Sequence, residues 1–371
     1  MKVLFLANIP SPYRVDFFNE LGKKCELTVT FEGILATDRD AKWVYSEMEH
    51  FHAVFLKGLR TKSDQFLCTD IISVIRKKYD HIIVGGYSTP TGMLAIEYMR
   101  FHKIPFWIEA DGGLISQDNV VKFHIKSHLI SSASGWFSSG KMTTDYLVHY
   151  GANSDGIKVY PFSSISRKEL LTDICTNELK QKYRNEFGLT GTKIILSVGK
   201  FGNNDGYRKG FDILMRAFLR CSEDYHLYIV GDAPTKEFLV LKKSLGLNNV
   251  HFLEFMPKKD LKKMYCASDV FCLQTREDIW GLVINEAMAA GLPVITTNRC
   301  IAGMELVEEG RTGYIVPVED ERLLAERITS VLENDDLRVS MGRNGLEKIR
   351  YWTIENMAEQ HYRELLKENG N

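Results

Sequence analysis

Residues 269–297 read DVFCLQTREDIWGLVINEAMAAGLPVITT, and they are the most informative segment for predicting the fold. The apolar run Val270–Leu273 predicts a buried strand. A polar turn follows, Gly281 opens a helix, and Gly291 with Pro293 ends that helix before the next apolar strand. A strand, a turn, a helix and a strand in this order predict half of an α/β layer of the kind that binds nucleotides.

The turn between this strand and helix is acidic. It carries Glu277 and Asp278, and the helix that follows contains Glu286. The backbone N–H groups at Gly281 and Leu282 belong to the first turn of the helix, where no partner exists within the helix itself. Because a helix N-terminus favours negative charge, we predict that an anion such as a diphosphate binds there.

Two series of alternating apolar and helix-like segments run along the chain. The first series predicts strands at 2–8, 25–31, 52–58, 81–87, 105–113 and 135–139, and the second predicts strands at 193–200, 225–232, 250–255 and 270–273. Strands separated by helices pair in parallel through right-handed crossovers. The predicted fold class is therefore α/β, with two doubly wound, Rossmann-like domains.

The length and composition agree with two soluble domains. A chain of 371 residues is long for one core and sufficient for two, and 44% hydrophobic with 26% charged residues is ordinary for a globular protein. We place the N-terminal domain at 1–167, the C-terminal domain at 168–350 and a terminal helix within 351–371. Domains that bind nucleic acids are usually strongly basic, so the net charge of -1 argues against a nucleic-acid partner.

The sequence also bears on the compartment. The apolar run near the N-terminus is six residues long, too short for a signal peptide, and no run of 18 apolar residues predicts a membrane-spanning helix. The seven cysteines are scattered without a C-x2-C pair, so we expect reduced thiols and a cytoplasmic protein.

The segment from Asp278 to Glu286, followed by AMAAGLPVI, resembles the Glu-x7-Glu signature of retaining GT-B glycosyltransferases of glycosyltransferase family 4, also named glycosyl transferases group 1. The resemblance implies the GT-B fold, in which two Rossmann-like domains face each other across a cleft. It implies that the N-terminal domain binds the acceptor, that the C-terminal domain binds a nucleotide sugar, and that the final helix crosses back to the N-terminal domain.

The same resemblance assigns roles to the two acids. The first acid of the signature contacts hydroxyls of the donor sugar, and this role passes to Asp278, where an Asp stands in place of the usual Glu. Glu277, next to it, is a further candidate for the same contact. The second acid holds the ribose of the nucleotide, and this role passes to Glu286.

The segment SVGKFGNNDGYRKG, residues 197–210, resembles the family's V-G-R followed by K-G pattern, in which two cations bind the donor diphosphate. Lys200 stands where Arg is usual, Lys209 matches the Lys, and Arg208 is adjacent. Two cations near a helix N-terminus neutralise a departing diphosphate without a divalent metal. The alternative is that these are solvated surface charges. Asp232 resembles the family's base-binding edge, or else belongs to a plain turn at the end of a strand.

Two places in the N-terminal half are candidates as well. Tyr13 and Arg14 follow the first strand in IPSPYRVDFF, a loop that the family uses near acceptor and donor phosphate; the alternative is a Pro-bounded helix start with a surface Arg. Glu109 and Asp111, in WIEADGG, match the place where the family contacts the donor sugar, Asp111 more closely. They are candidate catalytic groups with Asp278, and the alternative is that they cap the next helix.

A metal site is not expected. The Asp-x-Asp sequence at Asp38 and Asp40 is similar to the metal motif of the other glycosyltransferase fold, but no apolar strand precedes it. The family resemblance implies no metal and no cofactor, with a nucleoside-diphosphate sugar as co-substrate.

The expected function is therefore retaining, metal-independent transfer of a sugar from a nucleoside-diphosphate donor to a hydroxyl. The family often acts on saccharides or lipid-linked saccharides in surface polysaccharide or glycolipid biosynthesis, at the inner face of the membrane. Residues 122–130, KFHIKSHLI, are a candidate for peripheral membrane contact, and a solvated helix face is the alternative. Two other functions stay open: a nucleotide-sugar 2-epimerase, and a non-catalytic nucleotide-sugar binding protein.

Overall fold

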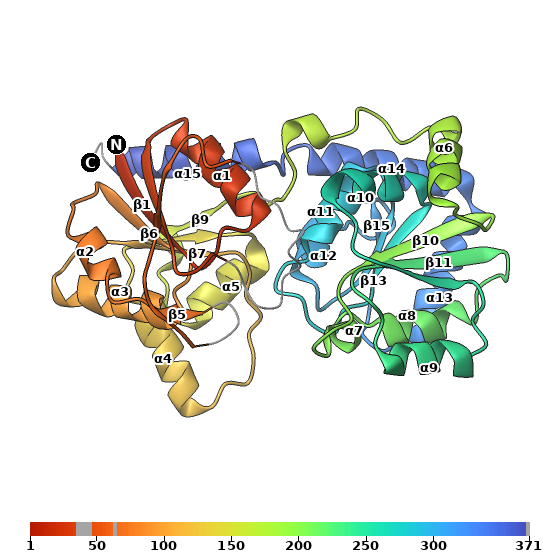
Figure 1. The fold of residues 1–371 in the computed structure, drawn as a ribbon, viewed down its shortest axis with the longest axis horizontal. Coiled ribbons are helices and arrows are strands. Elements are labelled where there is room, and N and C mark those ends of the chain that lie inside the picture. The colour runs from red at the N-terminus through yellow and green to blue at the C-terminus, as the bar shows by residue number, and fades with distance from the viewer. Residues whose placement is uncertain (35–46, 62–64, 369–371) are drawn as a thin grey trace. The chain divides into compact units, whose positions relative to one another are not determined.

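The chain divides into two compact units (Figure 1) in a computed structural model that describes residues 1–34, 47–61 and 65–368. The N-terminal unit comprises residues 1–164 together with 352–371, and the C-terminal unit comprises 165–351. Our sequence boundaries fell after residues 167 and 350. Asp38 and Asp40 lie outside the described residues.

The N-terminal unit is built on a seven-stranded parallel sheet in the order β3-β2-β1-β6-β7-β8-β9. Its strands are β1 (Lys2–Ala7), β2 (Glu26–Phe31), β3 (His52–Phe55), β6 (His81–Val84), β7 (Trp107–Ala110), β8 (Gly135–Ser138) and β9 (Ile157–Val159). Helices cover both faces of the sheet (Figure 1): α1 (Pro12–Gly22), α2 (Ile71–Ile75), α3 (Pro90–Phe101), α4 (Val120–Ile130), α5 (Lys141–His149) and α15 (Ile354–Glu368). A two-stranded ladder of β4 (Leu59–Arg60) and β5 (Phe66–Leu67) was not predicted.

The C-terminal unit is built on a six-stranded parallel sheet in the order β12-β11-β10-β13-β14-β15. Its strands are β10 (Lys193–Val198), β11 (Tyr225–Val230), β12 (Val250–Leu253), β13 (Val270–Leu273), β14 (Val294–Thr297) and β15 (Gly313–Val316). Its helices are α6 (Asn177–Phe187), α7 (Asp205–Arg208), α8 (Phe211–Phe218), α9 (Lys236–Ser244), α10 (Lys258–Ala267), α11 (Leu282–Ala289), α12 (Ile301–Leu306), α13 (Glu321–Glu333) and α14 (Asp335–Ile349). A short 3-10 turn lies at Arg167–Glu169 in this unit, and another lies at Ser154–Gly156 in the N-terminal unit.

Residues 269–297 adopt the predicted structure. β13, α11 and β14 follow one another as expected, and all four residues of β13 are buried. Strands enclosed on both faces are apolar along their whole length instead of alternating, because helices cover each side of the sheet. The same reason accounts for the buried run Val3–Phe5 in β1.

The terminal helix α15 belongs to the N-terminal unit. Lys24, just after α1, forms an ion pair with Glu359 of α15 at 2.6 Å. The His361 ring stacks on Phe137 of β8 with ring centroids 4.1 Å apart, and Trp107 of β7 donates a hydrogen bond to Glu368. α15 therefore brings a buried histidine and Glu368 to the sheet of the N-terminal unit, and Glu359 ties the helix to the segment after α1.

One expectation from the sequence is wrong. Cys175 and Cys266 form a disulfide that ties the segment before α6 to the end of α10, so not all seven cysteines are free thiols. The expectation failed because the two residues are 91 positions apart in the sequence, and only the fold brings their Cα atoms to 5.7 Å. The remaining five cysteines are free.

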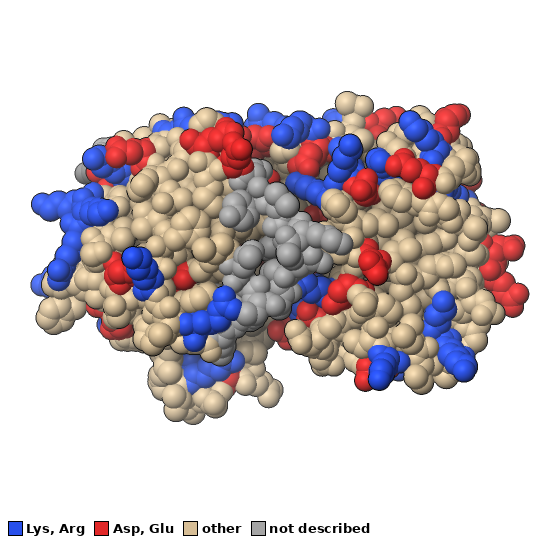
Figure 2. Space-filling model, viewed as in Figure 1, with Lys and Arg blue, Asp and Glu red and all other residues tan. Residues whose placement is uncertain are grey.

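The surface carries charges of both signs. On the face drawn in Figure 2, basic and acidic side chains are dispersed among uncharged surface, as a net charge of -1 would suggest. No helix in the described ranges combines the length and apolar character required to cross a bilayer.

Candidate functional site

The site residues of the C-terminal unit gather where the strand order reverses. From β10 the chain proceeds outward through β11 and β12, and from β13 it proceeds the other way through β14 and β15. Loops after β10 and β13 therefore diverge, which leaves room for a ligand at the carboxyl edge of the sheet. Lys200 follows β10 and Asp278 follows β13, so both lie at this reversal.

Lys209 and Asp278 form the centre of this site. The Lys209 Nζ contacts Asp278 Oδ2 directly, although the two residues are 69 positions apart, and their side chains are only 16% and 10% exposed. The Asp278 Oδ1 accepts a hydrogen bond from the backbone N–H of Trp280 at 3.4 Å. The structure thus brings together the predicted phosphate cation and the predicted sugar-binding acid.

Two glycines allow this close approach. Gly281, the residue before α11, has φ of +98°, and a Cβ placed there would lie 2.7 Å from the Cys300 Sγ. A Cβ at Gly199 would lie 3.3 Å from Lys209 Cγ, so the Lys209 stem runs along the backbone just before Lys200. Any larger residue at Gly281 would be strained by its backbone conformation as well as by the contact.

Asp232 supports the loop that carries Lys200. Its carboxylate accepts hydrogen bonds from the backbone N–H groups of Phe201 and Gly202, the second at 3.2 Å. Both oxygens of Asp232 therefore bind backbone N–H groups in this structure, which fits the alternative of a turn at the end of a strand. The same loop holds Asn203 and Asn204 at positive φ, 52° and 68°, which non-glycine residues rarely adopt.

Arg208 and Glu277 lie at the exposed rim of the site. Arg208 pairs with Asp205 at 2.9 Å and donates to the backbone carbonyl of Glu277 at 3.3 Å. The Glu277 side chain is 56% exposed and lies 3.7 Å from Arg299. The backbone of Glu277, more than its carboxylate, is therefore what the structure uses to organise the turn.

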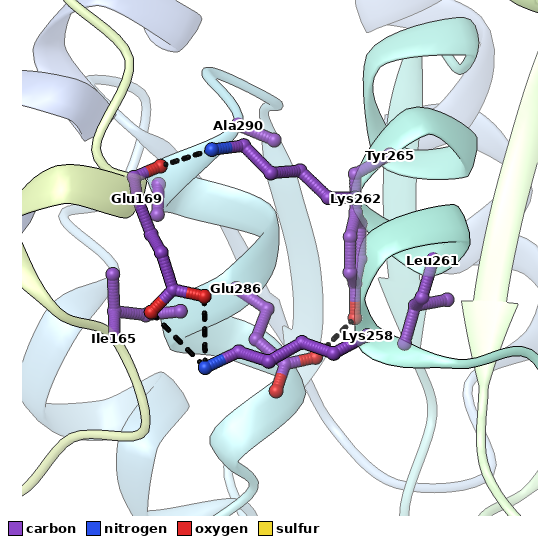
Figure 3. Close-up of a pocket in the computed structure, with 9 residues that line it drawn as sticks. Ile165, Glu169, Lys258, Leu261, Lys262, Tyr265, Glu286 and Ala290 are labelled. Atoms are coloured by element: carbon purple, nitrogen blue, oxygen red, sulfur yellow. Dashed lines mark hydrogen bonds and ion pairs between the residues drawn. The ribbon is translucent and has the colours of Figure 1, made fainter. Parts of the chain in front are cut away.

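Glu286 lies in a separate, partly enclosed hollow on α11. A cavity of about 30 Å³ is lined by Glu286 with Tyr265, Lys258, Lys262 and Glu169 together with Ile165, Leu261, Ala289 and Ala290. Figure 3 shows the Tyr265 hydroxyl pointing to the Glu286 carboxylate, and the hydrogen bond measures 3.0 Å. Lys258 pairs with the Glu169 carboxylate at 2.8 Å, and Lys262 donates to the Glu169 carbonyl at 2.8 Å.

The N-terminal unit holds a second cluster, at its own reversal of strand order between β1 and β6. Arg14 of α1 donates to both oxygens of Glu109, at 3.0 and 2.9 Å, and also contacts Asp111. The Arg14 side chain is 9% exposed and that of Glu109 is 0% exposed, whereas Asp111 retains 28%. Arg14 is therefore a buried cation that bridges two carboxylates, and Asp111 is the member of the cluster that reaches the surface.

Neighbouring groups complete this buried cluster. His361 Nε2 lies 3.3 Å from Glu109, and the Tyr160 hydroxyl donates to Asp111 at 3.1 Å. Burial alone would raise the pKa of Glu109, but Arg14 and His361 outweigh burial and bring it to about 2. Burial raises the pKa of Asp111, and the charge of Glu109 adds to this effect.

Tyr13 lies beside the cluster. Its ring packs edge-on against Phe162 with centroids 5.7 Å apart, and burial raises the pKa of its hydroxyl, which therefore stays protonated at neutral pH. Because Glu109 is fully enclosed, we expect it to hold Arg14 in place instead of contacting a substrate. Among the predicted residues of this unit, Tyr13 and Asp111 are those with side-chain surface available.

Several side chains at these sites were not predicted. They share a long sequence separation from the residues they contact, and they are Glu169, Lys258, Lys262, Tyr265, Tyr160 and His361. His361 illustrates the reason: a lone histidine in a helix reads as a surface residue, and only the packing of α15 against β7 and β8 brings it to Glu109. No motif in the sequence marked it.

A family model matches the C-terminal unit. Residues 180–348 match the model described as "Glycosyl transferases group 1". This range contains the reversal point, the Lys209–Asp278 pair and Glu286.

Curated relatives match over part of their length. "Spore coat protein SA" of Bacillus subtilis (strain 168) is 34% identical over 184 residues, 45% of this chain and 48% of the relative. "D-inositol 3-phosphate glycosyltransferase" of Corynebacterium diphtheriae is 29% identical over 231 residues, 59% of this chain and 52% of the relative. The chain thus spans about half the length of these curated relatives.

Solved structures share the whole fold. The crystal structure of Anabaena Alr3699/HepE in complex with UDP matches with a TM-score of 0.80 and 19% identity, over 99% of this chain and 100% of that one. A sucrose-phosphate synthase from Thermosynechococcus elongatus matches with a TM-score of 0.78 and 18% identity over 99% of this chain and 100% of that one. The predicted α/β class, a GT-B fold of two Rossmann-like units, is confirmed.

Proposed function

Because residues 180–348 match the model of the glycosyl transferases group 1, we propose that this chain is a member of that family and transfers a sugar from a nucleoside-diphosphate sugar to an acceptor hydroxyl. The reaction proceeds with retention at the anomeric carbon and without a divalent metal or another cofactor. The observation that carries the proposal is the contact of Lys209 with Asp278 at the reversal point of the C-terminal sheet. A cation and a carboxylate held side by side there suit a substrate that joins an anionic diphosphate to a polyol.

The leaving group is the main chemical demand of this reaction. A nucleoside diphosphate departs with developing negative charge, and fixed cations in a partly buried site stabilise that charge. Lys209 supplies the buried cation, Lys200 and Arg208 supply further positive charge, and the N-terminus of α11 at Gly281 and Leu282 adds its dipole. These groups replace the metal that a diphosphate would otherwise require.

The sugar and the ribose are recognised by carboxylates. Asp278 accepts hydrogen bonds from hydroxyl groups of the donor sugar, and Glu286 accepts hydrogen bonds from hydroxyl groups of the ribose. Asp278 is bound to the Lys209 ammonium, which reduces the nucleophilicity of its oxygens. For this reason we assign Asp278 to sugar recognition and propose a front-face transfer, in which the departing phosphate takes the acceptor proton, over a double displacement through a covalent intermediate.

Neighbouring structures indicate which donor to test first. Anabaena Alr3699/HepE is described in complex with UDP, with UDP and glucose, and with UDP-glucose. A uridine diphosphate sugar is therefore our first candidate donor, and a guanosine diphosphate sugar is the second. A phosphatidyl-myo-inositol mannosyltransferase of Mycobacterium leprae is among the relatives, and we propose a saccharide or lipid-linked saccharide acceptor, in polysaccharide or glycolipid biosynthesis.

A thermal-stability panel tests the donor site. At a concentration 100 times its dissociation constant, a nucleotide that binds the folded chain stabilises it by about 2.7 kcal/mol. We expect UDP or GDP to raise the unfolding temperature while ADP and CDP do not, and we expect EDTA to leave the shift unchanged. No shift with any nucleotide would refute the donor site, and a shift that EDTA removes would refute metal independence.

Product analysis separates the three possible functions. The selected nucleotide sugar is incubated with the chain, with and without a panel of saccharide and lipid-linked acceptors. Transfer to an acceptor, or slow hydrolysis that releases the nucleoside diphosphate, supports the transferase. Conversion to the 2-epimer identifies an epimerase, and binding without any turnover identifies a non-catalytic binding protein.

Helix α4 is the candidate for membrane contact. Val120, Val121 and Ile125 are 72%, 68% and 47% exposed, a set of aliphatic side chains that a solvated helix face would not require. Lys122 and Lys126 both pair with Asp118, at 2.7 and 2.8 Å, which offsets part of their charge. We therefore propose that the chain acts in the cytoplasm, with α4 resting on the inner face of the membrane mainly through its apolar side chains.

Vesicle sedimentation tests this contact. We expect the chain to bind phosphatidylglycerol vesicles, and we expect the double variant Val120→Glu with Val121→Glu to reduce that binding at least fivefold, because two charges replace two aliphatic anchors. Val240→Glu is the matched control, since Val240 on α9 is 66% exposed in the other unit. Equal binding by the double variant and the control would contradict the proposal.

A further inference from the structure

The hydrogen bond between Tyr265 and Glu286 carries an inference that rests on the proposed function. Tyr265 lies on α10 and Glu286 on α11, and the hydroxyl oxygen is 3.0 Å from Glu286 Oε2. We propose that Tyr265 is a positioning residue, which holds the Glu286 carboxylate in the orientation that accepts hydrogen bonds from the ribose hydroxyls of the donor. Tyr265 thereby favours the binding of ribonucleotides over deoxyribonucleotides.

The surroundings of Tyr265 make it a fixed and permanent donor. The residue is 2% exposed, and its ring packs against Phe271 of β13 with centroids 5.7 Å apart. Burial raises the pKa of the hydroxyl far above its ordinary value, and the charge of Glu286 raises it further. A tyrosine that keeps its proton and cannot rotate freely can only donate toward the carboxylate.

A buried donor of this kind fixes the orientation that the carboxylate presents to a ligand. An ionised carboxylate only accepts hydrogen bonds, and Tyr265 occupies a position on Oε2 from the α10 side. The cavity beside Glu286, about 30 Å³, has room for one or two water-sized groups, the size of sugar hydroxyls. Figure 3 shows Glu286 and Tyr265 together at this cavity, with a dashed line from the Tyr265 hydroxyl to the Glu286 carboxylate.

The other polar groups around the cavity belong to a different contact. Lys258 and Lys262 reach the carboxylate and the carbonyl of Glu169, and Glu169 also accepts from the Ser166 backbone N–H at 2.9 Å. This arrangement ties the segment before α6 to α10 and encloses the cavity from one side. Tyr265 is thus the rigid, buried side chain through which α10 orients Glu286.

The consequence is a preference for ribonucleotides over deoxyribonucleotides, which binding measurements can quantify. A carboxylate held in place discriminates strongly between a ligand with a hydroxyl and one without it, since a missing hydroxyl leaves a half-buried acceptor unpaired. If the hydrogen bond from Tyr265 is removed, the Glu286 carboxylate samples other rotamers, and the ribose hydroxyl loses its hydrogen-bond acceptor. The affinity for a 2′-deoxy or 3′-deoxy nucleotide changes little, because the deoxy ligand lacks that contact in both proteins.

The test is calorimetric titration of Tyr265→Phe with UDP, GDP and their 2′-deoxy and 3′-deoxy forms. We expect the wild-type chain to prefer the ribonucleotide, and we expect the variant to bind it 5- to 10-fold more weakly while its affinity for at least one deoxy form stays within twofold. Tyr228→Phe is the matched control: the Tyr228 hydroxyl accepts from the Thr190 backbone N–H at 2.8 Å in the same unit, so its loss should leave both affinities unchanged.

The possible results distinguish this inference from the proposed function. If the wild-type chain binds neither UDP nor GDP, the proposed function falls and the inference falls with it. If the wild-type chain binds and prefers the ribonucleotide while a folded Tyr265→Phe variant shows the same preference, the inference alone is overturned. An equal loss for the ribonucleotide and both deoxy forms also overturns it, because that pattern indicates general damage to the pocket.

A second comparison keeps the inference testable if Tyr265→Phe does not fold. The variant Glu286→Gln is compared with the double variant that adds Tyr265→Phe. Because Gln replaces the carboxylate at position 286, the loss of the Tyr265 hydroxyl leaves no buried charge without its hydrogen-bond donor. If Tyr265 acts through Glu286, the added substitution changes nucleotide affinity by less than twofold. A further loss of more than threefold would show that Tyr265 acts by another route and would overturn the inference.

Discussion

Lys209→Ala should lower kcat/KM for the donor by about 100- to 1,000-fold, which is the usual loss when one preorganised group that stabilises developing charge is removed. The structure gives a reason why Lys209 matters more than Arg208: the Lys209 side chain is 16% exposed, whereas the Arg208 side chain is 45% exposed and lies at the rim of the site. Steady-state kinetics of transfer or donor hydrolysis provide the measurement. We expect Arg208→Ala, the matched control, to lose no more than about tenfold.

Asp278→Asn should separate binding of the diphosphate from turnover. In the unliganded chain Lys209 is neutralised by Asp278, so an incoming diphosphate competes with that carboxylate for the same ammonium. Asn removes the competitor and keeps the shape. We expect nucleoside diphosphate to bind as tightly as before or more tightly, while turnover falls at least 100-fold because a sugar contact is weakened. Weaker diphosphate binding together with unchanged turnover would contradict both assigned roles.

Arg14→Met should destabilise the N-terminal unit by about 3–5 kcal/mol, the range observed when one partner of a buried ion pair is removed. The Arg14 side chain is 9% exposed, and without it Glu109 and Asp111 would face each other with no buried guanidinium between them. Urea denaturation, followed by tryptophan fluorescence and circular dichroism, measures the unfolding transition of this unit. Arg14→Lys should lose less, since it keeps the charge and forfeits only the bidentate geometry.

The Arg14→Met penalty should depend on pH. In wild type the lowered pKa of Glu109, about 2 against an ordinary 4.5, contributes stability that is present above pH 4.5 and lost as the pH falls toward 2. Without Arg14, burial and mutual repulsion raise the pKa of both carboxyls, so protonation favours the folded variant. The difference between variant and wild type should therefore shrink as the pH is lowered from 8 to 5. A difference that stays constant over that range would show that lost packing, and not charge, causes the effect.

The control for this explanation is a variant protein that lacks one of the two carboxylates, Glu109 or Asp111. Glu109→Gln removes the carboxylate that is 0% exposed and keeps its volume. If repulsion between carboxylates causes the destabilisation, Arg14→Met should cost clearly less in the Glu109→Gln background than in wild type. An equal cost in both backgrounds would contradict the charge argument.

The sequence by itself determined the two α/β layers. Most of their strands are largely apolar, and helix-length segments separate them, so the alternation of strands and helices follows from residues that are close in the sequence. It also placed Asp278 and Glu286 correctly on the turn and the helix after β13, because turn residues and helix breakers act within a few positions. The position of Lys200 just after β10 followed in the same way.

Only the tertiary structure decided which side chains contact one another. Glu109 is 95 positions from Arg14, Lys209 is 69 positions from Asp278, and the terminal helix delivers His361 to the same cluster as Arg14. The Asp232 carboxylate accepts hydrogen bonds from backbone N–H groups, and Glu109 is fully buried and pairs with Arg14. Both residues resembled ligand-binding acids in the sequence. The physical reason is that backbone periodicity depends on near neighbours, whereas burial, pairing and pKa depend on elements that meet only when the sheets are packed.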